Sequence, residues 1–356
     1  GLAALEQAVT GRNPKVVSVT MDSAGGKIQV PALLADTSDL ASFVNRRALR
    51  RLDHYIRMAL LGGYYALDDA GMLESGRRRL GIIVATGYGA TCNTFDFQNS
   101  MITAADPCGS PTKFSNSVHN AAAGNISILL NETGPNLSVS HHDMSFASAL
   151  LTAVHWLDEG RVDTLLIGGV DEFCKVLGYY WHCCNTDSGE NISGDAAADS
   201  RHRAIIGEGA CFFVLTNDAA NGSAYGCIET VETGNFLRGQ VKLPEKAVYF
   251  LGADGYSRHE DQYAEIVPTG AAAAVYTPVY GGIPVGHAFD LALAALSLRR
   301  RTLYGSLANP PDNRNQLNLI EKNAILNTER ICCLKLGAGG SYGSITLTSK
   351  STAPAV

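Results

Sequence analysis

The chain has 356 residues, of which 46% are hydrophobic and 17% are charged, and its formal net charge is −6. It is long enough to bury a large core, either as one large domain or as two tightly fused halves. The negative charge excludes an electrostatic footprint for nucleic acid. Because the sequence contains no run of about 18 apolar residues, it predicts no membrane span.

Apolar segments typical of strands alternate along the chain with Ala- and Leu-rich segments typical of helices. The predicted strands are Val16–Thr20, Leu80–Thr86, Leu137–Ser140, Thr164–Val170, Ala210–Thr216, Ala247–Leu251, Ala274–Tyr280, Ile331–Leu336 and Ser344–Thr348. The predicted helices are Tyr55–Ala70, Ala121–Leu130, Ser145–Leu157 and Ala288–Leu298. Several strands are continuous apolar runs, so both of their faces are expected to be covered. The pattern therefore predicts an α/β layered architecture.

Two of the predicted helices, Ala121–Leu130 and Ala288–Leu298, carry almost no charge. A helix that is apolar on all sides is usually buried, so both are expected to lie between two sheets. Two polar stretches, Asn185–Ser200 and Asn309–Asn318, are predicted to be surface loops.

The nine cysteines are an odd number, and Cys183-Cys184 and Cys332-Cys333 are adjacent pairs without C-x-x-C spacing. This pattern argues against a zinc site and against a secreted disulfide framework. The first residues, Gly1–Leu5, lack the basic start of a signal peptide. We therefore expect a cytoplasmic protein with reduced thiols, and neither a metal nor a cofactor.

A set of short motifs carries more information than the periodicity. In chain order they are Ala121–Ser127, Gly134–Val139, Gly160–Glu172, Gly207–Ala210, Gly286–His287 and Gly337–Ser341. Together they resemble the A-A-G-x-x-S-I helix, the G-P-S strand, the G-G segment, the G-E-G-A signature, the second catalytic histidine and the G-F-G-G-T-N loop of β-ketoacyl synthases. The resemblance implies a thiolase-like αβαβα five-layered fold with two pseudo-repeated halves. The expected halves are residues 1–220, which hold the nucleophile elbow, and residues 221–356.

In the resembled family the nucleophile is a cysteine nine residues after the first glycine of the G-P-S strand. Counting from Gly134 gives Asp143. A carboxylate suits a helix N-terminus, so Asp143 is interpreted as a helix cap or structural residue. It cannot hold an acyl chain as a thioester, so the elbow is degenerate and the condensing cycle is not expected.

The other catalytic positions of the family are also altered. The histidine of its N-A-H-G-T-x-T segment has Ile266–Gly270 as its nearest counterpart, without a histidine. The lysine five residues before the second histidine falls at Gly282, and the gating phenylalanine of the terminal loop falls at Ala338. His287 alone is retained, as a remnant, and the terminal loop is read as Gly337, Ala338, Gly339 and Gly340. No catalytic residue is expected.

The segment Ser110–Asn120 corresponds in the resembled family to part of the dimer interface and of the acyl tunnel. Candidates for a tunnel or interface role are Phe114, Val118 and His119, together with Met144 and Phe146 beside the elbow. Packing at the interface alone is an equally open interpretation of these side chains.

The resemblance therefore implies a non-condensing subunit of the chain-length-factor type. Such a subunit would pair with an active β-ketoacyl synthase as a heterodimer and help to elongate a polyketide or fatty-acid-like chain with malonyl units. The growing chain would be linked through phosphopantetheine to an acyl carrier protein. Two alternatives stay open: an independent malonyl decarboxylase or acyltransferase that uses Asp143 or Ser145, and a non-catalytic scaffold.

Overall fold

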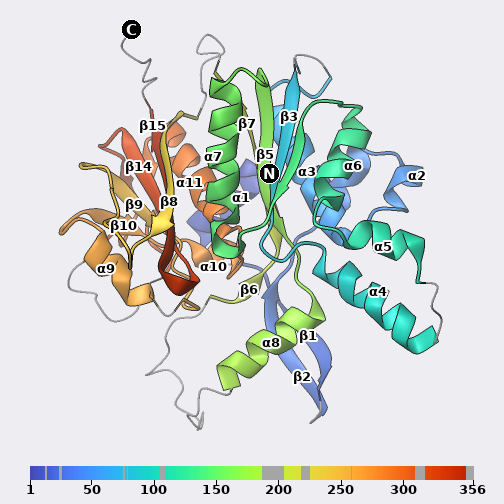
Figure 1. The fold of residues 1–356 in the computed structure, drawn as a ribbon. Helices are drawn as coiled ribbons and strands as arrows, with labels where there is room; N and C mark the ends of the chain where they lie inside the picture. The colour runs from blue at the N-terminus through green and yellow to red at the C-terminus, as the bar shows by residue number, and fades with distance from the viewer. Residues whose placement is uncertain are drawn as a thin grey trace.

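The computed structural model describes residues 1–12, 14–23, 26–74, 77, 79–104, 109–186, 204–217, 225–257, 259–308 and 317–349. Residues 187–200 and 309–316, the greater part of the two predicted surface loops, lie outside the described residues. Two sheets form the body of the described chain, with helices between them and against their outer faces (Figure 1).

The first sheet has the strand order β4-β3-β5-β7. Its strands β3 (Leu80–Ala85), β4 (Asn136–Val139) and β5 (Thr164–Asp171) run parallel, and β7 (Gly209–Thr216) pairs antiparallel with β5. Every residue of β3 and β5 is buried. The continuous apolar runs in the sequence therefore have a simple cause, because helices cover both faces of these parallel strands.

The second sheet has the strand order β12-β10-β9-β14-β15-β8. Its strands are β8 (Cys227–Asn235), β9 (Val248–Leu251), β10 (Ala272–Ala274), β12 (Asn318–Leu319), β14 (Arg330–Leu336) and β15 (Ser341–Thr348). In the segment β10-β9-β14-β15 the first three strands are parallel and the last is antiparallel. The first sheet shows the same directions in the order β4-β3-β5-β7, so the two sheets are pseudo-repeats of one another.

One long helix follows the equivalent strand in each sheet, and both helices lie between the sheets (Figure 1). α7 (Ser145–Asp158) follows β4 and contacts β3, β4 and β5 on one side and β8 and β15 on the other. α11 (Gly286–Arg300) follows β10 and contacts β5 and β7 as well as β9, β14 and β15. Twelve of the fifteen α11 residues are buried, which matches its nearly uncharged sequence.

The outer layers complete the arrangement. α3 (His54–Asp69) and α6 (Ala121–Leu130) cover the outer face of the first sheet. On the second sheet, alternate residues of β9 belong to different cores: Phe250 packs with the central helices, whereas Tyr249 packs with Tyr263 of α9 (Tyr263–Ile266). The chain therefore has the thiolase-like αβαβα five-layered fold with two pseudo-repeated halves.

Two local predictions are wrong. The helix Ala121–Leu130 lies in an outer layer rather than between the sheets, and its few charges reflect exposed apolar residues such as Ile128, which is 74% exposed. The predicted strand Ala274–Tyr280 is strand only at its start, and Thr277–Tyr280 forms the short helix α10. Pro278 lies in the first turn of α10, where its missing N–H costs nothing, whereas in a sheet it would remove a hydrogen bond.

The sequence patterns predicted the strand that begins at Val16 but not its hairpin partner Gly26–Leu33, and they missed β8 and the helices Thr91–Ala104 and Lys175–Thr186. The remaining elements are α1 (Leu2–Gly11), β1 (Val16–Ser23), β2 (Gly26–Leu33), η1 (Ser38–Ser42), α2 (Arg46–Leu49), α4 (Thr91–Ala104), α5 (Pro111–Ser117), η2 (His142–Met144), α8 (Lys175–Thr186), β6 (Ile206–Gly207), η4 (Glu260–Gln262), β11 (Thr302–Leu303), β13 (Ala324–Ile325) and η5 (Ala338–Gly340).

The glycine that opens the G-P-N-L-S-V motif is required by close packing. A Cβ atom at Gly134 would lie 1.9 Å from the backbone oxygen of Leu80, at the start of the neighbouring strand β3. We expect Gly134→Ala to lower the free energy of unfolding by about 2–4 kcal/mol, because the backbone must shift to relieve the overlap. The measurement is urea denaturation followed by circular dichroism.

Gly124→Ala is the matched control for Gly134→Ala. A Cβ atom at Gly124, inside α6, meets no described atom within 4 Å. This substitution is expected to stabilise the chain by up to about 1 kcal/mol, because alanine favours the helix. Equal effects of the two substitutions would contradict the steric argument.

Candidate functional site

The elbow between β4 and α7 is held by one buried hydroxyl. The Oγ atom of Ser145, the first residue of α7, accepts the His141 N–H at 2.8 Å and lies 2.6 Å from His142 O and 2.9 Å from Thr86 O. Ser145 is completely buried. His142 has a φ of 46°, a left-handed conformation that few non-glycine residues adopt. The Ser145 hydroxyl therefore fixes a tight elbow and does not face solvent.

Asp143 lies at the elbow, but the interpretation of Asp143 as a helix cap is wrong. The N-cap residue of α7 is Met144, and no side-chain hydrogen bond caps this helix in the described part of the chain. The Asp143 carboxylate instead lies 3.1 Å from His142 Nδ1 and accepts the backbone N–H of Ala338. Asp143 therefore contacts the terminal glycine-rich loop, which comes later in the chain.

Lys335 provides a buried cation beside Asp143. Its Nζ atom lies 2.9 Å from Asp254 Oδ2 and 3.9 Å from Asp143 Oδ1, and it donates to Gly252 O at 3.3 Å. The Lys335 side chain is only 3% exposed. We call Asp143, Lys335 and Asp254 the ion cluster. The elbow, β14 and the loop after β9 each supply one member.

The electrostatics of the ion cluster favour a charged Asp143. Burial on its own would raise the pKa of Asp143, but His142, Lys335 and the Ala338 N–H together outweigh it and lower that pKa below its ordinary value. In return, the hydrogen bond to Asp143 raises the pKa of His142, against the opposing effect of burial. The elbow between β4 and α7 therefore carries a paired carboxylate.

The segment predicted to correspond to the family's first histidine lies apart from the ion cluster. Ile266–Gly270 is at the end of α9 and in the turn before β10, whereas Asp254 lies in the loop directly after β9. Sequence reasoning missed both Asp254 and Lys335. The sequence did contain a signal of a buried ion pair. A single lysine lies in the apolar segment Ile331–Leu336, and lysine is rarely buried without a partner.

His287 is enclosed at the start of α11. It is fully buried, and its Nε2 atom lies 3.0 Å from the backbone oxygen of Cys333, so that Nε2 carries the proton. Its Nδ1 atom finds no hydrogen-bond partner among the described residues. Burial, which Lys335 reinforces, lowers the pKa of His287 to about 4. A neutral imidazole whose N–H is already bonded to a carbonyl is poorly placed to polarise a substrate carbonyl.

The terminal loop lies directly on the elbow. A Cβ atom at Gly337 would lie 3.1 Å from Asp143 Cβ. Gly339 and Gly340 have φ values of 69° and 79°, a region that glycine adopts without strain. Asn235 and Phe236 hold these two residues through hydrogen bonds to their carbonyl oxygens. Ala338, the second residue of this loop, is exposed.

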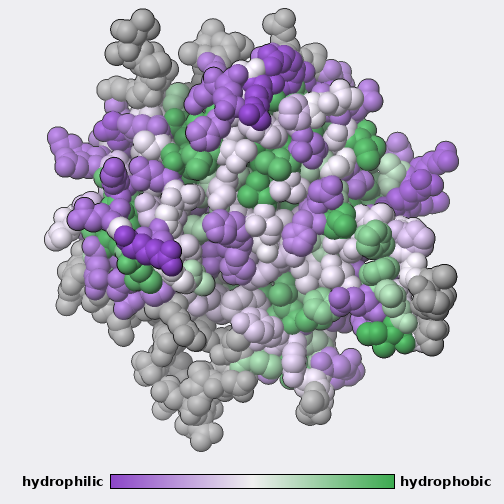
Figure 2. All heavy atoms as spheres, in the orientation of Figure 1, coloured by the Kyte–Doolittle hydropathy of each residue, from purple (hydrophilic) through white to green (hydrophobic). Residues whose placement is uncertain are grey.

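The five tunnel or interface candidates fall into two groups. Phe114 and Val118, on α5 and at its end, are 57% and 39% exposed, and His119 is exposed with its ring against Gly89. Met144 and Phe146 are buried inside the chain, and the Phe146 ring packs against Phe213 and His287. Only the first group is on the surface, where Figure 2 shows hydrophobic residues over the ends of α4 and α5.

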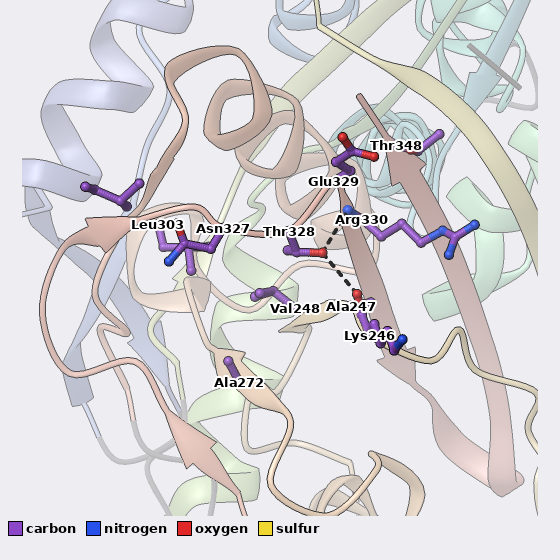
Figure 3. Close-up of a pocket in the computed structure, with 11 residues that line it drawn as sticks. Lys246, Ala247, Val248, Ala272, Leu303, Asn327, Thr328, Glu329, Arg330 and Thr348 are labelled. Atoms are coloured by element: carbon purple, nitrogen blue, oxygen red, sulfur yellow. Dashed lines mark hydrogen bonds between the residues drawn. The ribbon is translucent and has the colours of Figure 1, made fainter. Parts of the chain in front are cut away.

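A groove of about 770 Å³ lies at the opposite end of the second sheet (Figure 3). It is lined by Val248 and Arg330, the first residues of β9 and β14, whereas Asp254 and Lys335 lie at the far ends of these two parallel strands. Arg330 forms an ion pair with Glu229. The groove therefore belongs to a different part of the molecule from the ion cluster.

No group of three or more His, Cys, Asp or Glu side chains in the described chain is arranged to hold a metal ion. None of the helices in that part of the chain is long and apolar enough to cross a membrane.

Solved structures with the same fold cover nearly the whole chain. The ishigamide ketosynthase/chain length factor matches with a TM-score of 0.68 at 18% identity, covering 98% of this chain and 95% of that one. The AntDE:AntF complex, a type II acyl-carrier protein with its ketosynthase bound to the hexaketide, matches with a TM-score of 0.73 at 12% identity, covering 97% and 95%. A β-ketoacyl synthase from Burkholderia phymatum matches with a TM-score of 0.73 at 14% identity, covering 90% and 88%.

Relatives in sequence cover less of this chain. Polyketide synthase ThaG of Burkholderia thailandensis is 30% identical over 280 residues, which are 74% of this chain and 5% of that protein. Nodulation protein E of Rhizobium sp. (strain N33) is 26% identical over 272 residues, which are 71% of this chain and 66% of that one. The 3-oxoacyl-(acyl-carrier-protein) synthase 2 of Vibrio harveyi is 23% identical over 142 residues, and the match spans 39% of this chain and about a third (34%) of that enzyme. The family model of the β-ketoacyl synthase N-terminal domain matches residues 13–220, more than half of the chain, and the chain therefore belongs to the β-ketoacyl synthase family.

Proposed function

We propose that the chain is a non-condensing subunit of the chain-length-factor type, which pairs with an active β-ketoacyl synthase. The observation that carries this proposal is the ion cluster. The position of the family's nucleophile holds a carboxylate, and that carboxylate is paired with a buried lysine rather than left open for a substrate. A carboxylate cannot form the thioester that carries the acyl chain between the steps of condensation.

The partner would supply the cysteine and bind the acyl carrier protein with its phosphopantetheine-linked chain. Support comes from the surface of α4 and α5, where Met101, Ile102, Phe114 and Val118 are exposed apolar side chains. Exposed apolar patches of this kind are typical of protein interfaces. A chain-length factor next to a ketosynthase is named among the structural neighbours, and a ketosynthase with its acyl-carrier protein is named in another.

The division into residues 1–220 and 221–356 also belongs to this proposal. The two pseudo-repeated sheets support it, because the strands of the first sheet end with β7 and the second half begins with β8. Each proposed half contributes to the ion cluster, so neither half would carry the altered site alone.

No observation favours the alternative of an independent enzyme using Ser145, because that hydroxyl is completely buried at the elbow. Asp143 as an acid or base in a malonyl decarboxylase would have to give up its contacts with His142 and Lys335. The scaffold alternative differs from the proposal in one property only, namely whether surface residues of this chain affect the product.

The deciding experiment is intact mass spectrometry of the purified chain, alone and co-purified with a candidate partner ketosynthase. Both samples are incubated with malonyl- and acyl-loaded acyl carrier protein. Acyl mass on the partner only, with elongation that requires both chains, supports the proposal. Acyl mass on this chain alone, or release of CO₂ from malonyl groups without the partner, contradicts it.

Tunnel substitutions separate the chain-length factor from the scaffold. We expect Phe114→Ala in the assembled pair to lengthen the main product, because it removes a bulky side chain from the proposed tunnel wall, and Val118→Trp to shorten it. The readout is the product length by liquid chromatography and mass spectrometry. Ile325→Ala is the control, because Ile325 is 75% exposed and lies in the groove at the far end of the sheet. Unchanged products in both tunnel variants would favour a scaffold.

A further inference from the structure

Two cysteines outside the ion cluster face each other at the starts of two helices. Cys92 is the second residue of α4, and its Sγ atom lies 3.8 Å from the backbone oxygen of Phe173. Cys174 directly precedes α8, and its Sγ atom accepts the backbone N–H of Leu177 at 3.4 Å. Because Phe173 immediately precedes Cys174 in the chain, the contact of Cys92 with Phe173 brings the Cys92 thiol beside the Cys174 thiol, and the two thiols interact.

The surroundings of this thiol pair shift the pKa values of the two cysteines in opposite directions. The hydrogen bond from Cys92 lowers the pKa of Cys174, and the N–H groups of Leu177 and Val176 at the start of α8 lower it further against the effect of burial. The same hydrogen bond raises the pKa of Cys92, as do burial and the nearby Glu172. Cys174 is therefore the thiol of the pair that loses its proton more readily.

Other cysteines of the described chain have the opposite electrostatics. Burial raises the pKa of Cys211 to about 12 and also raises the pKa of Cys332 to about 12. Cys333 is next to Cys332 on β14, but successive side chains of a strand point to opposite faces, so these two thiols do not meet. Reactivity toward oxidants follows thiolate character, which singles out Cys174.

We propose that Cys92 and Cys174 are an oxidation site, at which a peroxide converts the two thiols into a reversible disulfide. The Cys174 thiolate attacks one oxygen of hydrogen peroxide and becomes a sulfenic acid, and the released hydroxide takes up a proton and leaves as water. The Cys92 sulfur then attacks the Cys174 sulfur, and the second water leaves with the Cys92 proton. In sum, two thiols lose two electrons and one peroxide is reduced to two waters.

The geometry gives this bond a structural consequence. Cys92 is partly exposed, which gives a small oxidant a route to the buried Cys174. The bond would tie the first turn of α4 to the start of α8 (Figure 1). α4 also carries Phe97, whose ring packs on Phe114 of α5 at 5.5 Å. Oxidation is therefore expected to restrain the exposed α4–α5 surface and to raise the melting temperature by several degrees.

The test is peptide mapping of the intact wild-type chain, reduced, desalted and treated with hydrogen peroxide. The expected product is the tryptic peptide Leu80–Lys113 linked to Val162–Lys175, with a loss of about 2 Da that dithiothreitol reverses. Because Cys108 lies on the same peptide as Cys92, two variants assign the bond. Cys108→Ser should keep the linked peptide, and Cys92→Ser should lose it and leave Cys174 as a sulfenic or sulfinic acid.

The wild-type map decides the proposal even if a variant fails to fold. Two unlinked peptides after peroxide treatment, with both cysteines reduced or separately oxidised, would overturn it. So would a linked peptide that persists in Cys92→Ser, because the bond would then involve Cys108. The outcome is independent of the proposed function, since the mapping needs neither a ketosynthase partner nor an acyl carrier protein.

Discussion

Replacing Lys335 with methionine is expected to lower the free energy of unfolding by about 3–5 kcal/mol at neutral pH, because removing one partner of a buried ion pair leaves charge uncompensated. Lys335 faces Asp254 at 2.9 Å and Asp143 at 3.9 Å, and its side chain is 3% exposed. Methionine has a similar length, so the change mainly removes the cation. Urea denaturation of the wild type and of Lys335→Met gives the difference directly.

A charge-neutral variant distinguishes lost charge from lost packing. In the triple variant Lys335→Met, Asp143→Asn, Asp254→Asn no uncompensated charge remains, so most of the lost stability should return. Lys322→Met is the matched control, because Lys322 is exposed, and it should change the free energy of unfolding by no more than about 0.5 kcal/mol. A triple variant as unstable as Lys335→Met would mean that the lysine matters for its packing and not for its charge.

When the pH is raised from acid to alkaline, the free energy of unfolding is expected to fall less in Asp290→Asn than in the wild type. Asp290 is fully buried on α11 and accepts the Tyr280 hydroxyl at 2.7 Å. Burial raises the pKa of Asp290 from its ordinary value of 3.8 to about 7. Between these two values the folded chain keeps a proton that the unfolded chain has released.

The sign of the pH dependence follows from this difference. The contribution of Asp290 to stability is fully present below pH 3.8 and is lost as the pH rises through about 7. Asparagine has no proton to lose, so the wild type should lose on the order of 2–4 kcal/mol more than Asp290→Asn between about pH 4 and pH 8.5. Urea denaturation at both pH values measures this difference. Asp158→Asn is the control, because Asp158 is exposed. Parallel pH profiles for wild type and Asp290→Asn would show that Asp290 ionises normally.

The sequence predicted the strands well, because each strand is itself a run of apolar residues that can be recognised without knowing its neighbours. Strands β3, β5, β7, β9, β14 and β15 each coincide with a predicted apolar run to within a few residues at either end. The hydrophobic pattern predicted the wrong position for a helix where burial depends on contacts with distant parts of the chain. The nearly uncharged sequence of Ala121–Leu130 predicts a central helix, but this segment lies in an outer layer. The helix that lies between the sheets in this half is α7. Local composition says that a face is apolar without saying what covers it.

The motif spacing also located the elbow, because the residue at position 143 is a property of the sequence alone. That Asp143 is not a thiol, and that a thioester is therefore impossible there, required no coordinates. The terminal glycine-rich loop and His287 were found in the same way. The contacts of Asp143 were not predicted, because its contacts with His142 and Ala338, like the lack of a side-chain cap on α7 among the described residues, depend on the turn of the backbone.

Only the tertiary structure decided which charged groups surround Asp143. Lys335 and Asp254 are 81 residues apart in the chain, and Asp143 precedes both of them by more than a hundred. Nothing in their spacing indicates contact, because β9 and β14 become neighbours only through the order of strands in the second sheet. The sequence by itself therefore determined that a carboxylate stands at position 143. The packing of two pseudo-repeated halves decided which buried charges lie beside it, since an ion pair forms only between groups that the fold brings together away from water.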